Sequence, residues 1–258
     1  MSLLAQTAVK SGRCNLEHII LDGASTDNTI LVVAKYPAIT FLSQSDNGMY
    51  DALSNGFKYV TGHLMGYLNA GDTLFPWAFD VLLDVFSNSD IKWLTGYTSL
   101  INEKHQVTHT WKPPRYRNEF ICNGFYADPK YPFGIQQEST FWRTDLLTYV
   151  NRSRLSKFQL AGDYFLWTEF AQHTLLHSVM SPLGAFLIHH NQLSDQKDLY
   201  VSEVQTFTRP AKPKELFTRW WETKCNPFLK GSLWNWTLGQ SKAKLFDYDH
   251  SAKCWINR

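Results

Sequence analysis

The chain has 258 residues, of which 44% are hydrophobic, and its 25 basic residues nearly balance its 23 acidic ones to give a net charge of +2. A chain of this length and composition can bury a substantial core, which excludes a disordered or fibrous protein. Because the charge balance creates no global positive field, the sequence does not predict a nucleic-acid-binding protein.

Cysteine usage and hydropathy indicate the compartment. The four cysteines form neither a Cys-x-x-Cys pair nor a zinc-ligand spacing, which suits reduced thiols in a cytosolic protein. No apolar run reaches the roughly 18 residues of a membrane span, and the N-terminal segment has too short an apolar core for a secretory signal. We therefore expect a cytoplasmic protein that does not cross the membrane.

Apolar runs alternate with helix-like segments along the first half of the chain. Strands are expected at residues 17–22, 38–44 and 64–69, with one helix after Thr26 and another from about Met49. Strands that alternate with helices form parallel βαβ units. The nearly continuous apolar character of the first and third runs is typical of strands covered on both faces. The sequence thus predicts an α/β fold.

The first and third of these strands each end in a polar cluster. Asp22 and Ser25 belong to "DGAST", and Asn69 and Asp72 belong to "NAGD". Ligands of open α/β sheets bind beyond the carboxyl ends of the strands, so these four side chains are expected to share one crevice. Taken singly, each cluster is explained at least as well by a turn or a helix cap. Their order, with "SDNGMYDALSNG" between them, favours a ligand site.

Five blocks resemble the inverting nucleotide-sugar glycosyltransferases of the GT-A fold, the bacterial group called family two. They are "DGASTDNT" at residues 22–29, "SQSDNGMYDALSNG" at 43–56, "YLNAGD" at 67–72, "QESTFWR" at 137–143 and "LAGDYFLW" at 160–167. Each block is weak by itself, but five in the right order make chance similarity improbable. The resemblance implies a GT-A-like, mostly parallel sheet flanked by helices. We expect this domain at residues 1–200 and a helical, Trp-rich segment at 201–258.

The resemblance also implies the substrates and the donor-binding residues. The donor is expected to be a nucleotide sugar, UDP-linked, and the acceptor a glycan or glycolipid of cell-surface polysaccharide synthesis. The residues that match the donor-binding parts of the family are Asp22, Ser25, Asp46, Tyr50, Asp51 and Asn69, with Gln137 and Arg143 as further candidates. Asp51 and Asn55 lie one helical turn apart and could instead bond each other on a solvated face.

Asp72 is the candidate metal ligand. A nucleoside diphosphate leaving group develops negative charge, which a divalent cation held by hard oxygen ligands usually stabilises. The resemblance implies Mn²⁺ or Mg²⁺ at Asp72, bound directly or through water, with Asn69 as a second oxygen donor. The commoner form of the family has two successive carboxylates, and Gly71 replaces the first of them here.

Asp163 is the candidate general base, which an inverting transfer needs to take the proton from the attacking hydroxyl. It begins the amphipathic segment "DYFLWTEFAQH" and is expected at a helix N-terminus. An ordinary N-cap aspartate is the alternative, but the position after "QESTFWR" favours the base. Gly162 stands where the family usually has an acidic residue or Ala, so Asp163 is a single carboxylate.

Two segments near the C-terminus have two interpretations each. "HHNQLSDQ" at 189–196 resembles a loop that closes over the diphosphate, with His190 or His189 near the metal or phosphate; surface or core packing is the alternative. Residues 215–244 mix four tryptophans with Lys and Arg, which suits peripheral contact with the inner face of the membrane. Packing of a C-terminal helix pair onto the catalytic domain explains this composition equally well.

One part of the family pattern is missing. Relatives open with a strand that ends in a Thr-Pro-x-Tyr-Asn-like motif, whereas "MSLLAQTAVKSG" resembles the helix after that strand. The missing strand would lie between the strands at 17–22 and 64–69, whose facing edges would be left bare. Either the sequence is truncated, or the gap is closed by a partner chain, by the C-terminal segment or by direct pairing of the two strands. A homo-oligomer is the favoured solution.

Two other classes of function stay open. A catalytically impaired glycosyltransferase-like protein could serve as a binding or partner subunit, and the missing strand supports this class. A nucleotidyltransferase-like enzyme could also use carboxylates at strand ends with a divalent ion, but the blocks at 137–143 and 160–167 favour the glycosyltransferase. The Gly-rich loops of P-loop and dinucleotide enzymes are absent from the sequence.

Overall fold

The protein is described by a computed structural model that covers residues 2–129, 131, 134–189, 192–224 and 241–257. The helices are α1 (Thr7–Lys10), α2 (Thr29–Val33), α3 (Met49–Gly56), α4 (Ala78–Phe86), α5 (Asn118–Cys122), α6 (Arg152–Leu155), α7 (Gly162–Ala171), α8 (Lys197–Gln205) and α9 (Pro213–Lys224). The strands are β1 (His18–Asp22), β2 (Ile39–Ser43), β3 (Leu64–Met65), β4 (Thr73–Leu74), β5 (Trp93–Ile101), β6 (Val107–Trp111), β7 (Thr140–Arg143), β8 (His177–Pro182), β9 (Gly184–Leu187), β10 (Leu245–Asp249) and β11 (Cys254–Asn257). The α/β class expected from the sequence is confirmed.

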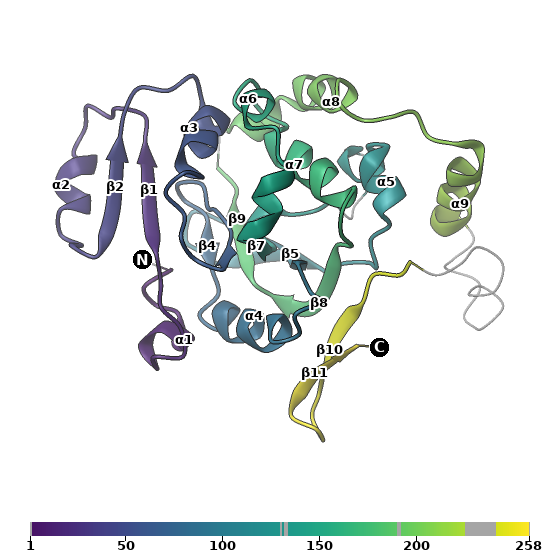
Figure 1. The fold of residues 1–258 in the computed structure, drawn as a ribbon, viewed down its shortest axis with the longest axis horizontal. Helices are drawn as coiled ribbons and strands as arrows, with labels where there is room; N and C mark the ends of the chain where they lie inside the picture. Colours follow the sequence, from purple (N-terminus) through teal and green to yellow (C-terminus); the bar gives the residue numbers. More distant parts are fainter. Residues whose placement is uncertain (1, 130, 132–133, 190–191, 225–240, 258) are drawn as a thin grey trace.

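Strand β5 is the centre of the main sheet. It runs parallel to β8 and β9 and antiparallel to β6 and β7. On one side of β5 the sheet continues through β7 to β3, and on the other side through β8 to β10 and β11. The sheet is therefore mixed, and helices pack against it (Figure 1).

The period of two along the central strands divides the core between the two faces of the sheet. Trp93 and Trp142 belong to the cluster under α3, α5 and α7, whereas their neighbours Leu94 and Phe141 belong to the cluster over α4. Trp93 stacks on Trp167 of α7 with ring centroids 5.5 Å apart. The nearly continuous apolar sequence of these strands follows from burial on both faces.

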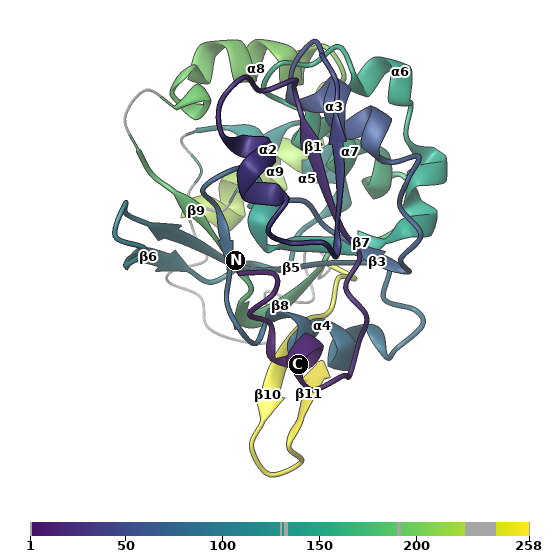
Figure 2. The same ribbon diagram turned by 90° about the vertical axis from the view of Figure 1, so that its left-hand side faces the viewer.

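Strands β1 and β2 form a separate parallel pair, in register from His18 opposite Ile39 to Asp22 opposite Ser43. Figure 2 shows this pair in front of the main sheet. Outside the pair, β1 contacts α3. The Glu17 carboxylate, just before β1, accepts hydrogen bonds from the backbone N–H groups of Thr61 and Gly62, at 2.9 and 3.2 Å. The pair is therefore joined to the rest of the molecule through α3 and the loops around it.

The gap expected from the sequence is present in the described part of the chain. There β1 pairs only with β2, and β3 pairs only with β7, so direct pairing of the two flanking strands is wrong. The described strands of the C-terminal segment do not close the gap either, because β10 joins the sheet at β8, at the opposite end from β3. Closure by a partner chain stays a prediction.

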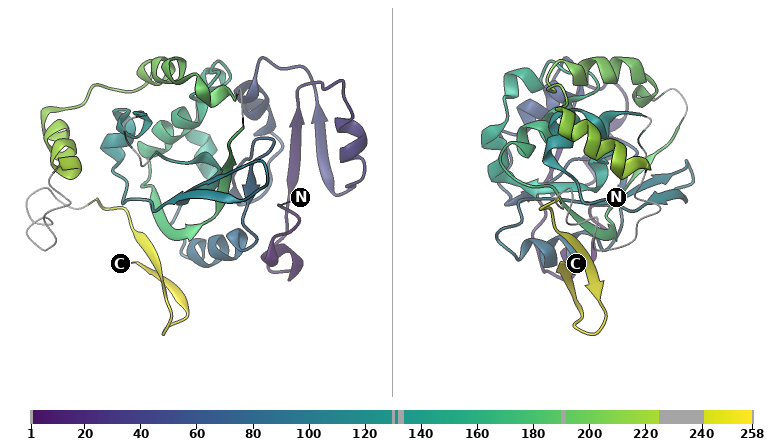
Figure 3. Two further views of the ribbon diagram at one scale, coloured as in Figure 1. Left: turned by 180° about the vertical axis from the view of Figure 1, so that it is seen from behind. Right: turned by 90° about the vertical axis from the view of Figure 1, so that its right-hand side faces the viewer.

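Two expected elements differ from the structure. The strand expected at 64–69 is only two residues long, because the chain leaves the sheet after Met65 and the carbonyl oxygen of Tyr67 accepts a hydrogen bond from the Gln137 side chain. The C-terminal segment is helical in α8 and α9, but residues 245–257 form a hairpin instead (Figure 3). The expected tail tryptophans Trp234 and Trp236 lie outside the described residues. No helix among the described residues combines the length and the apolar character that crossing a membrane requires.

Candidate functional site

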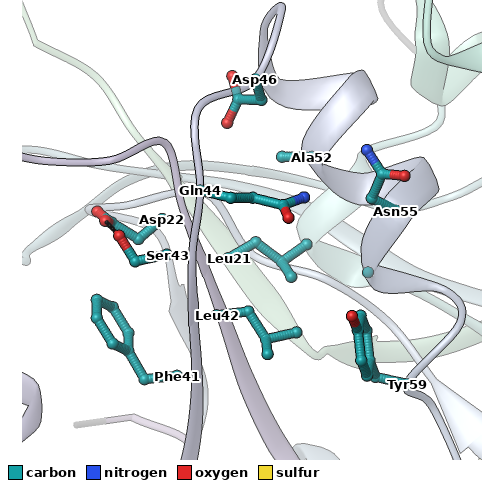
Figure 4. A pocket seen from close by; sticks show the side chains of 11 residues that line it. Leu21, Asp22, Phe41, Leu42, Ser43, Gln44, Asp46, Ala52, Asn55 and Tyr59 are labelled. Atoms are coloured by element: carbon teal, nitrogen blue, oxygen red, sulfur yellow. Dashed lines mark hydrogen bonds between the residues drawn. The ribbon is translucent and has the colours of Figure 1, made fainter.

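A pocket of about 250 Å³ lies between β1, β2 and α3. Figure 4 shows Asp22 and Ser43 side by side at the ends of the two strands, with Asp46 beyond them. Asp22 Oδ2 accepts hydrogen bonds from the backbone N–H of Ser25 at 3.0 Å and from Ser43 Oγ at 2.6 Å. The hydrogen bonds from Ser25 and Ser43 lower the pKa of Asp22, so this carboxylate stays ionised and fixed in place.

The other two acidic residues of this region hold the loop before α3. Asp46 lines the pocket, and its Oδ1 accepts a hydrogen bond from the backbone N–H of Gly48 at 2.9 Å. Asp51 accepts from the backbone N–H of Asn47 at 3.0 Å and from Asn55 Nδ2 at 3.3 Å. The local pairing that the sequence left open for Asp51 and Asn55 is thus present, whereas Asp46 faces the pocket.

Tyr50 joins the block at 43–56 to the block at 160–167. Its hydroxyl donates to the carbonyl oxygen of Leu160 at 3.0 Å. A Cβ added to Gly162 would overlap the Tyr50 ring, so only glycine allows this contact. Tyr50 therefore lies beside the candidate base rather than in the pocket, and its ring explains why a second carboxylate is missing at position 162.

Asp163 lies in the first turn of α7, where the N-cap residue is Ala161. The alternative of an N-cap aspartate is therefore wrong. Asp163 Oδ1 accepts a hydrogen bond from the backbone N–H of Tyr164 at 2.6 Å. Burial raises the pKa of Asp163 to about 7, so a substantial fraction of this carboxyl can accept a proton near neutral pH.

Three tyrosines from separate elements surround Asp163. They are Tyr50 of α3, Tyr67 of the loop after β3 and Tyr200 of α8. Burial, and after it the charge of Asp163, raises the pKa of each of these phenols well above its usual value. The phenols stay neutral, so the base has a partly apolar and partly hydrogen-bonding environment.

The "NAGD" loop is tied to β9. Asp72 Oδ1 accepts a hydrogen bond from the backbone N–H of Leu187 at 2.8 Å, and the backbone N–H of Asp72 donates to the carbonyl oxygen of Asn69 at 3.1 Å. Gly71 has φ +100°, and a Cβ there would lie 2.8 Å from the Leu187 side chain. Both facts exclude an unstrained carboxylate at position 71.

Glu138 is a site residue that the sequence reasoning missed. Only 4% of it is exposed, and its carboxyl adjoins that of Asp72. Burial and the neighbouring carboxyl raise the pKa of Glu138, and burial raises that of Asp72. The available signal was an acidic residue two positions before the buried strand "TFWR", where an unpaired charge is costly.

The remaining candidates fall in three places. Gln137 braces the "NAGD" loop, because Nε2 donates to the carbonyl oxygen of Tyr67 and Oε1 accepts from Asn69 Nδ2 at 3.4 Å. Arg143 instead donates to the carbonyl oxygens of Phe86, the last residue of α4, and of Ile91 beyond it, at 2.7 and 2.9 Å. His190 lies outside the described residues.

The donor set of the loop fits a divalent cation. Asp72 Oδ2 is buried and has no hydrogen-bond partner in the described structure, and a second carboxyl lies beside it. Hard oxygen atoms of this kind suit Mg²⁺ or Mn²⁺. The described residues contain no group of three or more His, Cys, Asp or Glu side chains that could hold a metal by themselves. A cation here would therefore need further oxygen ligands, such as phosphate or water.

Comparison with known proteins identifies relatives of this site. The chain is 28% identical over 132 residues to chondroitin synthase of Escherichia coli, a match that covers 46% of this chain and 19% of that protein. It is 28% identical over 106 residues to an uncharacterized glycosyltransferase of Nostoc sp., covering 39% and 31%. The chain thus spans less than a third of either relative.

The fold is similar to that of S. aureus TarS in its crystal structure in complex with UDP. The TM-score is 0.53 at 16% identity, and the match covers 91% of this chain and 70% of that one. The family described as Glycosyl transferase family 2 matches residues 1–145, more than half of the chain. The protein belongs to glycosyl transferase family 2, with the GT-A-like α/β fold of that group.

Proposed function

We propose that the protein transfers a sugar from a UDP-linked donor to a hydroxyl of a saccharide or lipid-linked acceptor, with inversion, in cell-surface polysaccharide synthesis. The observation that carries the proposal is Asp163, a partly buried carboxyl at the start of α7 whose pKa is raised to about 7. Family membership supports sugar transfer. The UDP bound by TarS supports the nucleotide, and chondroitin synthase supports a polysaccharide product.

In this proposal each chain residue has a defined task. Asp22, held ionised by Ser25 and Ser43, binds the nucleoside beside the pocket that Asp46 lines. The acceptor oxygen forms a bond to the anomeric carbon while the bond from that carbon to the diphosphate oxygen breaks. Asp163 takes the proton of the acceptor hydroxyl, and the nucleoside diphosphate leaves with the bonding electrons.

We assign the divalent cation, Mn²⁺ or Mg²⁺, to the "NAGD" loop. Asp72 would hold it, with Asn69 and Glu138 as further oxygen donors. When bound, such an ion offsets the negative charge of the diphosphate.

The role of the base is tested by Asp163→Asn, which keeps the shape of the side chain but cannot accept the proton. Turnover of a panel of UDP-sugars with Mn²⁺ should fall by about 100- to 10,000-fold. Glu169→Gln removes a carboxylate from the same helix and is the matched control. Turnover of the Asn variant within about twofold of the parent contradicts the assignment.

The cation is tested by calorimetry of UDP binding with and without Mn²⁺. The Asp72→Asn variant keeps an acceptor for the Leu187 N–H but loses the charge, so the Mn²⁺-dependent part of the affinity should disappear. Asp72→Ala should give the same result, and Asp198→Asn on α8 should not. An unchanged Mn²⁺ dependence in both Asp72 variants rules out the assignment.

Helix α9 supports a peripheral contact with the cytoplasmic face of the membrane. Leu216, Phe217 and Trp220 are each about half exposed, and Lys212 and Lys214 precede them. The expected result is cosedimentation with anionic vesicles that Phe217→Ser weakens. The proposed function also includes association of the chain with a second copy of itself.

A second candidate is a catalytically impaired subunit that binds nucleotide or a partner chain. The edge of β1 that pairs with no other strand among the described residues favours it. The UDP-sugar panel separates the two functions. Binding of UDP with no turnover of any donor supports the subunit, whereas turnover supports the enzyme.

A further inference from the structure

Helix α8 is connected to the start of α7 by one carboxylate. Glu203 Oε1 accepts a hydrogen bond from the backbone N–H of Gln159 at 2.8 Å. Its Oε2 accepts from the backbone N–H groups of Leu160 and Ala161, at 2.9 and 2.8 Å. Three successive N–H groups around a carboxylate form a charge-assisted set of hydrogen bonds.

The segment that Glu203 binds directly precedes the candidate base. Ala161 is the N-cap residue of α7, and Asp163 follows two positions later. The same segment is held from its other side, because Tyr50 Oη of α3 donates to the carbonyl oxygen of Leu160. The backbone before Asp163 is thus held by both helices: Tyr50 of α3 binds a carbonyl oxygen, and Glu203 of α8 binds N–H groups.

Helix α8 is itself anchored in the core, so the Glu203 carboxylate that binds residues 159–161 is held in a fixed position. Val204 is only 4% exposed, and Phe207, just beyond the helix, packs against Phe158 and Phe165 with ring centroids 5.2 and 5.4 Å apart. Arg154 donates to the carbonyl oxygen of Thr206 at 2.9 Å. Movement of α8 would therefore be transmitted to residues 159–161.

We infer that Glu203 is a positioning residue of the transfer reaction, which holds the start of α7 so that Asp163 faces the acceptor hydroxyl. The inference rests on the proposed role of Asp163 as the base. Glu203 does not touch the reacting atoms in this scheme; it acts through the backbone of residues 159–161.

Glu203 also places a negative charge near the candidate base Asp163. The titratable side chains that interact with Asp163 come from five elements: Tyr50 of α3, Tyr67 of the loop after β3, Glu138 before β7, Tyr164 of α7, and Tyr200 and Glu203 of α8. Burial is the main cause of the raised pKa of Asp163, and the negative charge of Glu203 raises it further. Removal of that charge should therefore lower the apparent pKa of the base.

Two substitutions separate geometry from charge. Glu203→Gln keeps the length but loses the charge and one acceptor oxygen. Glu203→Asp keeps the charge but is one methylene shorter, so it should not reach all three N–H groups. In both variants, amide hydrogen exchange at residues 159–161 should become at least about tenfold faster. The Asp163 carboxyl pKa, measured by ¹³C NMR, should fall in Glu203→Gln. Asp198→Asn, which removes a carboxylate from the same helix, is the control for both measurements.

Kinetics complete the test, with UDP-N-acetylglucosamine and UDP-glucose as donor probes and Mn²⁺ present. Both Glu203 variants should lose about 10- to 100-fold in kcat, as expected for a misplaced catalytic group, while the donor KM changes by less than about twofold. If Glu203 acts through Asp163, the double variant with Asp163→Asn should be no slower than Asp163→Asn itself.

The outcomes distinguish the inference from the proposed function. An Asp163→Asn variant with parental turnover overturns the base assignment and the inference with it. An inactive Asp163→Asn together with unchanged kcat in both Glu203 variants overturns the inference only. Independent, additive losses in the double variant also overturn it, because Glu203 would then act elsewhere. If Glu203→Gln does not fold, the Glu203→Asp measurements decide between these results.

Discussion

Asp163 combines two properties that predict its pH dependence. Its pKa is raised from 3.8 to about 7, with burial as the main cause, and only its deprotonated form can act as a base. The value of kcat should therefore rise with pH and level off above about pH 7. A profile measured at saturating donor checks this, and a plateau that begins near pH 4 would contradict it.

The same carboxyl should reduce stability near neutral pH. The folded protein binds this proton more tightly than the unfolded chain, so stability is lost as the pH rises from 3.8 to about 7. Asp163→Asn removes the cost, and we expect it to raise the free energy of unfolding by about 1–4 kcal/mol at pH 8. Urea denaturation should show this gain shrinking towards pH 4. A gain that is equal at both pH values would exclude the buried charge as its cause.

Gly162 shows how one position couples two sequence blocks. A methyl group there would overlap the Tyr50 ring, so Gly162→Ala should destabilise the protein by about 1–3 kcal/mol and displace Asp163. Gly62→Ala is the control, because the nearest atom to its added Cβ is at 3.5 Å. Thermal unfolding checks the difference, and equal effects of both substitutions would argue against the overlap.

The individual site residues were predictable where a side chain bonds within its own block. Asp22 with Ser25 and Asp51 with Asn55 are of this kind. Glu138 and Glu203 were not predictable, because each meets its partner across a large sequence separation: Glu138 meets Asp72, and Glu203 meets residues 159–161. The sequence shows that such carboxylates exist but not which backbone they reach.

At the scale of elements, Arg143 ties α4 to the neighbouring strands. Its guanidinium bonds the carbonyl oxygens of Phe86 and Ile91 and lies 5.6 Å from the centre of the Phe86 ring. Arg143→Ala should lower the free energy of unfolding by about 1–3 kcal/mol without changing UDP affinity. Lys92→Ala, which breaks a surface ion pair with Asp145, should cost much less. A large loss of UDP affinity in Arg143→Ala would restore the donor-binding role expected from the sequence.

Helices α2, α3 and α7 and strands β1 and β2 were expected from the sequence, but the C-terminal hairpin was not. Phe246 is buried in the cluster over α4, and β10 pairs with β8 through Leu245 opposite Ser178. The partner strand lies far upstream in the chain, so no local pattern distinguishes this strand from the helical tail that its surroundings suggested. Composition predicted a helical tail, whereas pairing with β8, far upstream in the chain, makes residues 245–249 a strand.

At the scale of the whole molecule, the binding residues and the base lie on parts of unequal stability. Asp163 lies on α7, whose aromatic rings pack with those of β5 and β7 in the large core cluster. Asp22 and Ser43, in contrast, end a two-stranded sheet. Two paired strands are marginally stable by themselves. The nucleoside side of the site should therefore open more readily than the base side.

Hydrogen exchange followed by mass spectrometry tests this difference. Peptides covering 18–43 should exchange much faster than those covering 93–101, because β1 has one paired edge in the described structure while β5 is enclosed by neighbours. Addition of UDP and Mn²⁺ should slow exchange in 18–43, since Asp22 and Ser43 line the pocket there. Asp22→Ala should abolish that slowing and leave 93–101 unchanged. Protection of 18–43 equal to that of 93–101 without nucleotide would show that the pair is not an unstable unit, and protection that grows with protein concentration would show that a second chain covers β1.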